Sequence, residues 1–361
     1  MADHLDRARR YVAASGIDAL LVTKAENRRH VTGFTGSAGL ALVSADAALL
    51  AVDFRYYEQA AAQAPACEVL RGGADPAGVL AEAVRAREIR RIGFESEFVP
   101  YAQVERLREK FAPAELAPLG DVDRLRWVKD AGEIAAIARA ADIADAAFAH
   151  ILSVLRPGLR EQDAALELEI FMRRAGAERL SFDSVLASGP RSALPHGRAT
   201  GRVMAAGDLV TLDFGAVYDG YGSDLTRTVV LGAPDDRQRR VYEVVLDAQQ
   251  QALAAIRSGV SSRDVDAVAR SAITAAGFGE AFGHALGHGI GLDVHEGPPL
   301  GPRNETVLEP GMVVTVEPGI YLPGWGGVRI EDDVVVTADG CEILTHAPKD
   351  LIALSVPGPT A

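Results

Sequence analysis

The sequence predicts an α+β protein with two domains, and three observations carry this prediction. The length of 361 residues exceeds that of one typical domain. Helical and strand-like segments alternate over the first ~120 residues, which is typical of a layered α/β domain. After residue 180, short glycine-rich strands surround two helices, which favours an antiparallel-rich α+β arrangement. A boundary is expected near residues 118–130, so we assign residues 1–122 to a smaller α/β domain and residues 123–361 to a larger one.

Local patterns define the elements of the first domain in order. Leu5, Ala8 and Val12 recur at helical spacing, so residues 3–15 are expected to form a helix. Short apolar runs predict strands at 18–23, 39–44, 48–53, 68–70 and 90–95. Helical patterns cover 77–86 and 101–111. The domain contains neither a GxGxxG nor a GxxxxGK[ST] motif, so no nucleotide-binding site is predicted.

The second domain is expected to begin with a long amphipathic helix. Asp130 and Glu133 form a D-x-x-E capping pattern. The apolar residues that follow are spaced by three or four: Ile134, Ile137, Ala141, Ala144, Phe148, Ile151 and Leu155. This spacing indicates a helix that packs one narrow face on a core. Further helices are predicted at 160–176, 236–258 and 262–276, and strands within 209–232, 313–322 and 327–337.

Composition excludes several classes of protein. The 37 basic and 50 acidic residues give a formal net charge of −13, and no run of Lys or Arg exceeds two. The chain therefore lacks the basic stripe that a nucleic-acid-binding protein needs. The first residues are charged and no apolar stretch reaches about 18 residues, which argues against a secretory signal and a membrane span. Two distant cysteines, Cys67 and Cys341, fit a reduced, cytoplasmic protein.

Four carboxylates interrupt apolar strands of the second domain. Asp213 follows the run LVTL, and Asp224 comes eleven residues later, so a hairpin across YDGYG would bring the two together. Glu317 ends the run MVVTV, and Glu331 lies in GVRIEDDVVV. A carboxylate inside such a strand is costly to bury unless it is paired or binds a metal. Each one alone could instead cap a turn, form an ion pair or face solvent.

Histidines point to a site in the same domain. Three of the eight histidines lie within residues 284–295: His284, His288 and His295. A lone histidine on an apolar face is usually a core residue, but this density is far above the average for the chain. The glycines between the histidines permit close approach of the backbone. We therefore interpret the segment as part of a functional site.

One imidazole and four carboxylates form a plausible ligand set for metal ions. The set comprises Asp213, Asp224, His288, Glu317 and Glu331. Hard oxygen ligands with one imidazole suit Mn²⁺, Co²⁺, Fe²⁺ or Zn²⁺ rather than Cu(I), and the thiolates of a structural zinc site are missing. Four negative charges match two divalent cations, so charge balance favours a dinuclear centre.

The order of five motifs resembles a known family of enzymes. LDFGA, SDLTRT, HALGHGIGLDVHE, VEPGIY and VRIEDD are similar to segments of the Xaa-Pro peptidases with the pita-bread fold, the prolidases and aminopeptidases P. NRRHVTGFTGSAGLALVS and AVDFRYYEQA resemble that family's N-terminal domain. The resemblance extends over nearly the whole chain. It implies a creatinase/prolidase-like domain over 1–122, a pita-bread metallopeptidase domain over 123–361, and a homodimer.

The resemblance also implies how metals are held. Asp213 would bind one metal ion only, Asp224 and Glu331 would bridge two, and His288 and Glu317 would bind the second. Manganese is the expected metal, with Zn, Co or Fe as alternatives. A water shared by the metals would be the nucleophile, with Glu317 placed to take its proton.

Four further residues match positions around the family's metal site. His196, His284 and His295 match histidines that hold substrate and stabilise the tetrahedral intermediate, and Arg329 matches an arginine near the metals. The expected activity is hydrolysis of the Xaa-Pro bond in dipeptides. Arg198 could bind the substrate's terminal carboxylate, or it could be an ordinary surface arginine.

Three alternatives stay open. The first is an aminopeptidase P that acts on longer proline-containing peptides. The second is a creatinase-like hydrolase that works without metal, and the third is a binding protein without catalytic activity. All five ligand positions are filled, which argues against the last two.

Overall fold

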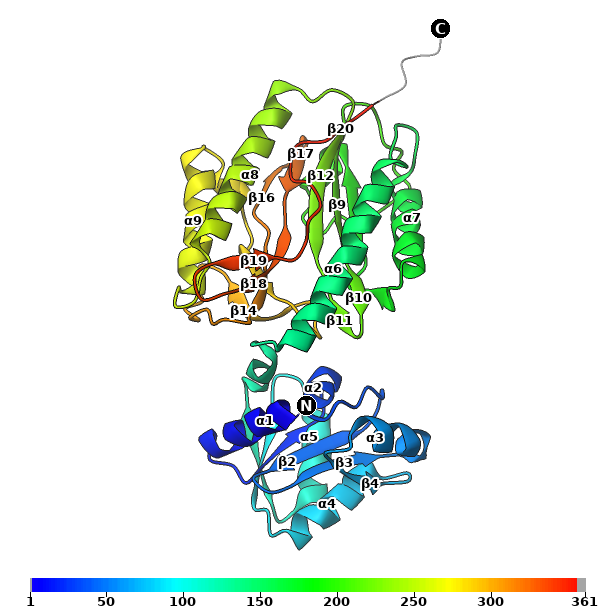
Figure 1. Cartoon of the computed structure of the whole chain (residues 1–361), viewed down its shortest axis with the longest axis vertical. Coiled ribbons are helices and arrows are strands. Elements are labelled where there is room, and N and C mark those ends of the chain that lie inside the picture. The colour runs from blue at the N-terminus through cyan, green and yellow to red at the C-terminus, as the bar shows by residue number, and fades with distance from the viewer. Residues whose placement is uncertain (1, 356–361) are drawn as a thin grey trace. The chain divides into compact units, whose positions relative to one another are not determined.

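The computed structural model describes residues 2–355, which form two compact units, Met1–Arg126 and Trp127–Ala361. The α+β prediction is confirmed for this two-domain chain: a mixed sheet with helices makes up the first unit, and mostly antiparallel ladders with helices make up the second (Figure 1). No helix in the described residues combines the length and apolar character that a membrane crossing requires.

The N-terminal unit is a six-stranded sheet in the order β4-β3-β2-β1-β5-β6, with β1 antiparallel to β2 and parallel to β5. Its strands are β1 (Ala19–Val22), β2 (Leu40–Ser44), β3 (Ala48–Val52), β4 (Glu68–Arg71), β5 (Arg91–Glu95) and β6 (Glu115–Leu119). Its helices are α1 (Ala2–Ala14), α2 (Ala25–Thr32), α3 (Tyr57–Gln63), α4 (Pro76–Ala86) and α5 (Tyr101–Phe111).

Both faces of this sheet are buried, which explains its continuous apolar strands. In β1, Leu20 and Val22 pack in a cluster with residues of α1, α2 and α3. Ala19 and Leu21 point to the opposite face and pack with residues of α4 and α5. Strands covered on both sides lose the alternation of apolar and polar residues. The polar helix α2 was not predicted, because its sequence AENRRHVT has no apolar periodicity.

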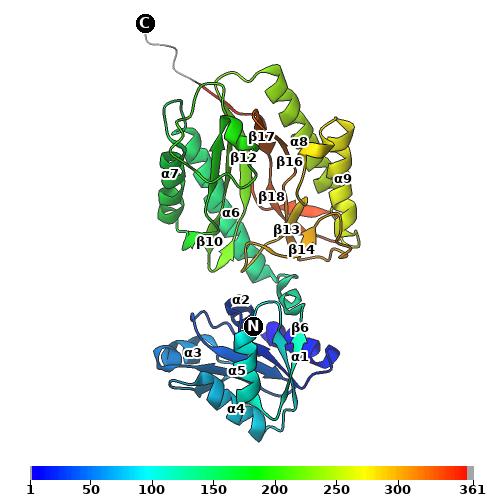
Figure 2. The same cartoon turned by 180° about the vertical axis from the view of Figure 1, so that it is seen from behind.

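In the C-terminal unit, two helix pairs flank the strands (Figures 1 and 2). Helices α6 (Ala131–Leu152) and α7 (Glu161–Arg174) pack on the sheet β20-β12-β9-β8, and α8 (Asp236–Ala255) and α9 (Ser262–Ala275) pack on the strands that follow them in sequence. The first four short strands are β7 (Arg179–Leu180), β8 (Val185–Ser188), β9 (Leu209–Phe214) and β10 (Ala216–Tyr218). The remaining strands are β11 (Tyr221–Gly222), β12 (Leu225–Leu231), β13 (Gly287–Gly289), β14 (Glu296–Leu300), β15 (Val313–Val316), β16 (Gly319–Leu322), β17 (Gly326–Arg329), β18 (Asp332–Val336), β19 (Cys341–Ile343) and β20 (Ala353–Leu354).

The predicted capping box at the start of α6 is confirmed. A carboxylate oxygen of Asp130 accepts a hydrogen bond from the backbone N–H of Glu133 at 2.9 Å, and Glu133 accepts one from the backbone N–H of Asp130 at 2.9 Å. The buried face of α6 is wider than predicted, because residues such as Ala140 and Ile143 are buried as well. The helix contributes to two separate clusters, one with α7 and one with β15 and β18.

Candidate metal centre and active site

Two segments that were predicted as continuous strands break at the same level of the fold. Residues 313–322 divide into β15 and β16, and residues 327–337 divide into β17 and β18. β15 pairs with β18, and β16 pairs with β17, so the chain changes partners between two separate ladders. Glu317 and Glu331 lie at these breaks, so the expectation that both are ordinary strand residues is wrong. Pro318 gives the physical reason, since it has no N–H group with which to continue the first ladder.

The two aspartates approach this break from the neighbouring sheet. β9 and β12 are antiparallel, with Asp213 opposite Thr226, so the predicted hairpin is confirmed. Asp224 directly precedes β12. Thr226 also forms a bridge with Glu331, and its Oγ1 donates a hydrogen bond to Glu331 Oε2 at 2.5 Å. The hairpin and the break between the ladders therefore meet around Thr226.

The imidazole of His288, in β13, faces two of these carboxylates. Its Nε2 lies 3.4 Å from Glu317 Oε1 and 3.7 Å from Asp224 Oδ2. Its Nδ1 lies 3.0 Å from the carbonyl oxygen of Gly289, which can only accept, so in the neutral ring Nδ1 carries the hydrogen. Burial, with a further contribution from His295, lowers the pKa of His288 to about 4. The ring is therefore neutral, and the lone pair on Nε2 points at these two carboxyl groups.

The carboxylates destabilise one another's charged forms. Burial, with the charges of Glu331 and Asp213, raises the pKa of Asp224. Burial, with the charges of Glu317 and Asp213, likewise raises the pKa of Glu331. The pKa of Glu317 is raised to about 8 by burial and by Asp213, although Arg329 opposes the shift. Within residues 2–355, the buried Oδ1 atoms of Asp213 and Asp224 have no hydrogen-bond partner. Arg329 supplies one positive charge beside four carboxylates, and divalent cations would supply the rest.

These residues fit divalent metal ions. Asp224, His288 and Glu331 offer ligand atoms that all lie within 4.8 Å of one another. Oxygen donors with one neutral imidazole suit first-row divalent metals. The orphaned oxygen atoms and the lone pair of His288 are the groups that a cation would satisfy.

Arg329 connects the carboxylates to a tyrosine that the sequence reasoning missed. Its buried guanidinium donates hydrogen bonds to Asp213 Oδ2, to Thr226 Oγ1 at 3.1 Å and to Tyr321 Oη at 2.8 Å. Burial lowers the pKa of Arg329, but Tyr321 and the neighbouring carboxylates outweigh it and raise the pKa above its ordinary value. Tyr321 Oη also lies 2.9 Å from His284 Nε2. The motif VEPGIY contains this tyrosine, but nothing in the sequence assigned it a role.

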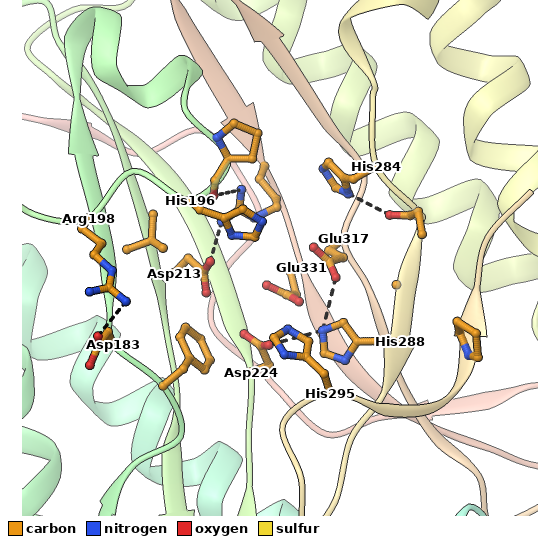
Figure 3. A pocket seen from close by; sticks show the side chains of 17 residues that line it. Asp183, His196, Arg198, Asp213, Asp224, His284, His288, His295, Glu317 and Glu331 are labelled. Carbon is orange, nitrogen blue, oxygen red and sulfur yellow. Dashed lines mark hydrogen bonds and ion pairs between the residues drawn. The ribbon is translucent and has the colours of Figure 1, made fainter. Parts of the chain in front are cut away.

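All nine residues predicted for the site line one cavity of about 530 Å³ (Figure 3). They are His196, Asp213, Asp224, His284, His288, His295, Glu317, Arg329 and Glu331. Figure 3 shows the carboxylates gathered near His288, with the other three histidines around them. The rings of His288 and His295 are 4.4 Å apart at an angle of 67°. Burial lowers the pKa of His284 to about 4, so this ring is neutral.

Buried and partly buried charged residues outside the cavity hold the histidine segments, and no sequence pattern pointed to them. In α9, Asp266 accepts a hydrogen bond from the backbone N–H of Leu286 at 3.0 Å, and Arg270 donates to the carbonyl oxygen of His284 at 2.8 Å. Beside His295, Glu296 forms a fully buried ion pair with Lys129 at 2.6 Å. Such contacts join residues far apart in sequence, so no local pattern predicts them.

Arg198 lies at one edge of the same cavity. Its guanidinium is 3.0 Å from the carboxylate of Asp183, and the two side chains are 76% and 74% exposed (Figure 3). Both interpretations of Arg198 from the sequence stay open, since the side chain lines the cavity and is also open to solvent. An exposed pair of this kind is weak and exchanges partners at little cost.

Comparisons with known proteins agree with this geometry. Residues 135–338 match Metallopeptidase family M24, and residues 4–128 match the Creatinase/Prolidase N-terminal domain. An uncharacterized peptidase of Bacillus subtilis, YqhT, is 48% identical over 351 residues, which cover 97% of this chain and 99% of that protein.

Two solved structures resemble the whole chain. The structure described as an Xaa-Pro dipeptidase from Bacillus anthracis has a TM-score of 0.96 and 47% identity, with 98% of this chain and 99% of that chain covered. The structure described as an X-Pro aminopeptidase from Thermotoga maritima has a TM-score of 0.89 and 42% identity, with 96% and 100% covered.

Proposed function

Because this chain belongs to metallopeptidase family M24, with a creatinase-like N-terminal domain and a C-terminal pita-bread domain, we propose that it hydrolyses the Xaa-Pro bond of dipeptides. The observation that carries the proposal is the group of four carboxylates around a neutral imidazole. Its donor atoms face one another without enough positive charge, at the base of a cavity with room for a small peptide. Only Asp213 in this group is paired with a cationic side chain in the described residues, that of Arg329, so the group is suited to binding metal ions.

In this proposal, two divalent ions would be held by Asp213, Asp224, His288, Glu317 and Glu331. Bound divalent ions would supply Lewis acidity and lower the pKa of water toward about 7. Manganese is the metal that we expect, and elemental analysis of protein purified without added metal tests this.

The remaining polar groups of the cavity would handle protons and charge. Glu317 would accept the proton of the attacking water, since its carboxylate lies beside His288 at the base of the cavity. His295 and His196 would donate hydrogen bonds to the developing oxyanion and the substrate. Tyr321 accepts a hydrogen bond from Arg329, so its own hydrogen is available to His284 Nε2. This arrangement holds the ring of His284 in one orientation.

Arg198 supports a dipeptide as the substrate. A dipeptide ends in a free carboxylate, and a guanidinium binds a carboxylate with two parallel hydrogen bonds. Arg329 is already bound to Asp213 and Tyr321, whereas the guanidinium of Arg198 pairs with the exposed carboxylate of Asp183. We propose that the substrate carboxylate replaces Asp183 at Arg198.

The second candidate function is cleavage of longer Xaa-Pro peptides. The similarity to an X-Pro aminopeptidase from Thermotoga maritima favours this function.

The deciding experiment compares three substrates with the metal-loaded enzyme: an Xaa-Pro dipeptide, its C-terminal amide and the matching Xaa-Pro-Yaa tripeptide. We expect the dipeptide to have the highest kcat/KM. The variant Arg198→Gln should lose this preference through a higher KM for the dipeptide, whereas Arg156→Gln, outside the cavity, should keep it. Equal or faster cleavage of the tripeptide would assign the chain to the aminopeptidases.

The other predicted properties have direct tests. A homodimer, expected from the family resemblance, would appear as a dimer mass by light scattering. A protein that binds no metal yet hydrolyses its substrate would fit a creatinase-like reaction. One that binds metal without any peptidase activity would fit a binding protein.

A further inference from the structure

The loop that carries His196 and Arg198 has little regular structure of its own. It follows β8, passes through the short helical turn η3 (Gly189–Ala193) and reaches β9 at Leu209 with only isolated bridges between. A loop without ladder or helix hydrogen bonds needs other partners to hold one conformation.

A single carboxylate binds the chain before and after His196. Glu161, the first residue of α7, has no exposed surface. Its Oε1 accepts hydrogen bonds from the backbone N–H and the hydroxyl of Ser188 at 2.9 and 2.8 Å. Its Oε2 accepts hydrogen bonds from the backbone N–H and the hydroxyl of Thr200 at 3.0 and 2.8 Å. The guanidinium of Arg191 also donates to Oε2. Ser188 ends β8, Arg191 lies in η3 and Thr200 follows His196 by four residues, so these donors lie on both sides of His196 in the sequence.

The contacts require an ionised carboxylate. Burial alone would raise the pKa of Glu161, but the hydrogen bonds from Ser188, Thr200 and Arg191 outweigh it and lower the pKa. An amide in the same place would turn its own NH₂ group toward some of these donors, since only a carboxylate accepts at both oxygens. The anchor therefore depends on the charge of Glu161 as well as on its shape.

The anchor holds the backbone on one side of His196, and Arg329 holds it on the other. Arg191, which binds the buried carboxylate, also donates to the carbonyl oxygen of Arg198 at 2.7 Å. On the cavity side, Arg329 donates to the carbonyl oxygen of Pro195 at 3.1 Å. The backbone on either side of His196 is therefore held, although its imidazole is exposed to the cavity.

We propose that Glu161 is a positioning residue that holds the His196 loop in the conformation that binds substrate, an inference that rests on the proposed function. Glu161 does not line the cavity and is not among the candidate metal ligands. Its loss should therefore displace His196 while the metal ions stay bound. This separates its role from that of a ligand.

The first test uses Glu161→Gln and a matched control, Glu169→Gln, in the same helix. Glu169 is partly exposed, and its carboxylate pairs with a surface arginine, Arg173, at 3.3 Å. Elemental analysis should find the same metal content in both variants and the wild type. In the metal-loaded enzyme, kcat/KM for an Xaa-Pro dipeptide should fall roughly 10- to 100-fold in Glu161→Gln, because a small displacement of a binding group is that costly. The control should match the wild type.

The second test is a double-mutant cycle with His196→Ala. If Glu161 acts through His196, Glu161→Gln should cost less than about twofold in the His196→Ala background, because the imidazole that it positions is already absent. Losses that multiply would overturn the proposal, because Glu161 would then act by a route that does not pass through His196. Loss of metal from Glu161→Gln would overturn it as well.

Hydrogen exchange measures the anchor without relying on activity. Amides of residues 189–200 should exchange faster in Glu161→Gln than in the wild type or in Glu169→Gln, and unchanged exchange would overturn the proposal. If Glu161→Gln does not fold, Thr200→Val removes one donor and keeps the carboxylate, and a smaller change in the same direction is expected. A wild-type enzyme that binds metal but cleaves no Xaa-Pro peptide would contradict the proposed function, and exchange would still show whether Glu161 holds the loop.

Discussion

Removing metal ions should destabilise the C-terminal unit by an amount that the proposed site allows us to calculate. Buried oxygen atoms of Asp213 and Asp224 have no hydrogen-bond donor in the described part of the chain. A cation that binds the folded site and not the unfolded chain stabilises the fold by an amount set by its degree of saturation. Chelation removes this contribution and leaves the carboxylates to repel one another.

Two sites set the size of the effect. A metal ion at a free concentration one hundred times its Kd stabilises the folded state by about 2.7 kcal/mol per site, so two sites give about 5 kcal/mol. For a unit the size of Trp127–Ala361, each kcal/mol corresponds to roughly 2–4 °C in Tm. The Tm of this unit should therefore fall by about 10–20 °C when a chelator removes manganese.

Tryptophan fluorescence isolates the relevant transition. The chain has two tryptophans, Trp127 and Trp325, and both belong to the C-terminal unit. Their emission during heating therefore reports on the unit that contains the candidate metal centre. The N-terminal unit has no tryptophan and does not contribute to this signal.

A pair of similar variants separates ligands from neighbours. Asp224→Asn removes the charge of a proposed bridging ligand, so the metal-dependent shift in Tm should fall to half or less. Asp333→Asn changes a neighbouring buried acid in the same way, but Asp333 only accepts a hydrogen bond from the backbone N–H of Asp224 at 2.8 Å, which the amide oxygen can replace. The Asp333→Asn variant should therefore keep the full metal-dependent shift in Tm. A wild-type protein with no metal-dependent shift, or a full shift in Asp224→Asn, would refute the reasoning.

Three further predictions concern the residues around the metals. His295→Ala should keep its metal content in elemental analysis but lose roughly 10²- to 10³-fold in kcat, as expected for one lost transition-state donor, and a loss of metal would make His295 a ligand instead. Tyr321→Phe should lower the free energy of unfolding by about 1 kcal/mol, since it removes hydrogen bonds to Arg329 and His284. It should also lower kcat, because the ring of His284 is no longer held in one orientation. Unchanged kinetics would contradict the role of Tyr321 in orienting His284. Acidification to about pH 5 should weaken metal binding, measured by equilibrium dialysis, because the buried carboxylates have raised pKa values and protons compete with the metal for their oxygen atoms, and unchanged metal content would contradict this ligand set.

Features with a local cause could be predicted from the sequence. Asp213 and Asp224 are separated by a turn, so a hairpin between them required only short-range reasoning, and the pairing of β9 with β12 confirms it. The capping box of α6 is likewise contained in four residues. The roles of the individual site residues remain predictions, although the structure brings all of them to one cavity.

Features that depend on distant partners could not be predicted. In the sequence, Glu161 looks like any acidic residue in the first turn of a helix. Only its burial against Ser188 and Thr200 distinguishes it from such a residue. The position of Glu317 was misassigned for a similar reason. An apolar run such as VVTVEPGIYL looks like one strand, and only the pairing of each half with a different partner reveals the break.

The three consecutive acids that begin with Glu331 show how one strand separates site residues from structural ones. Side chains alternate between the two faces of a strand. Glu331 and Asp333 therefore share the face toward Asp224, where Asp333 binds its backbone N–H. Asp332 points to the opposite face, where Arg227 and Lys349 each donate to it at 2.7 Å.

These different surroundings give the acids opposite electrostatic properties. Although burial raises the pKa of Asp332, Arg227 and Lys349 outweigh it and lower that pKa, so this carboxylate is ionised and needs no further cation. Burial and neighbouring carboxylates raise the pKa of Glu331. The ionised form of Glu331 is therefore stabilised only when a cation is added beside it. Identical chemistry at adjacent positions thus stabilises the fold on one face of β18 and prepares a metal site on the other.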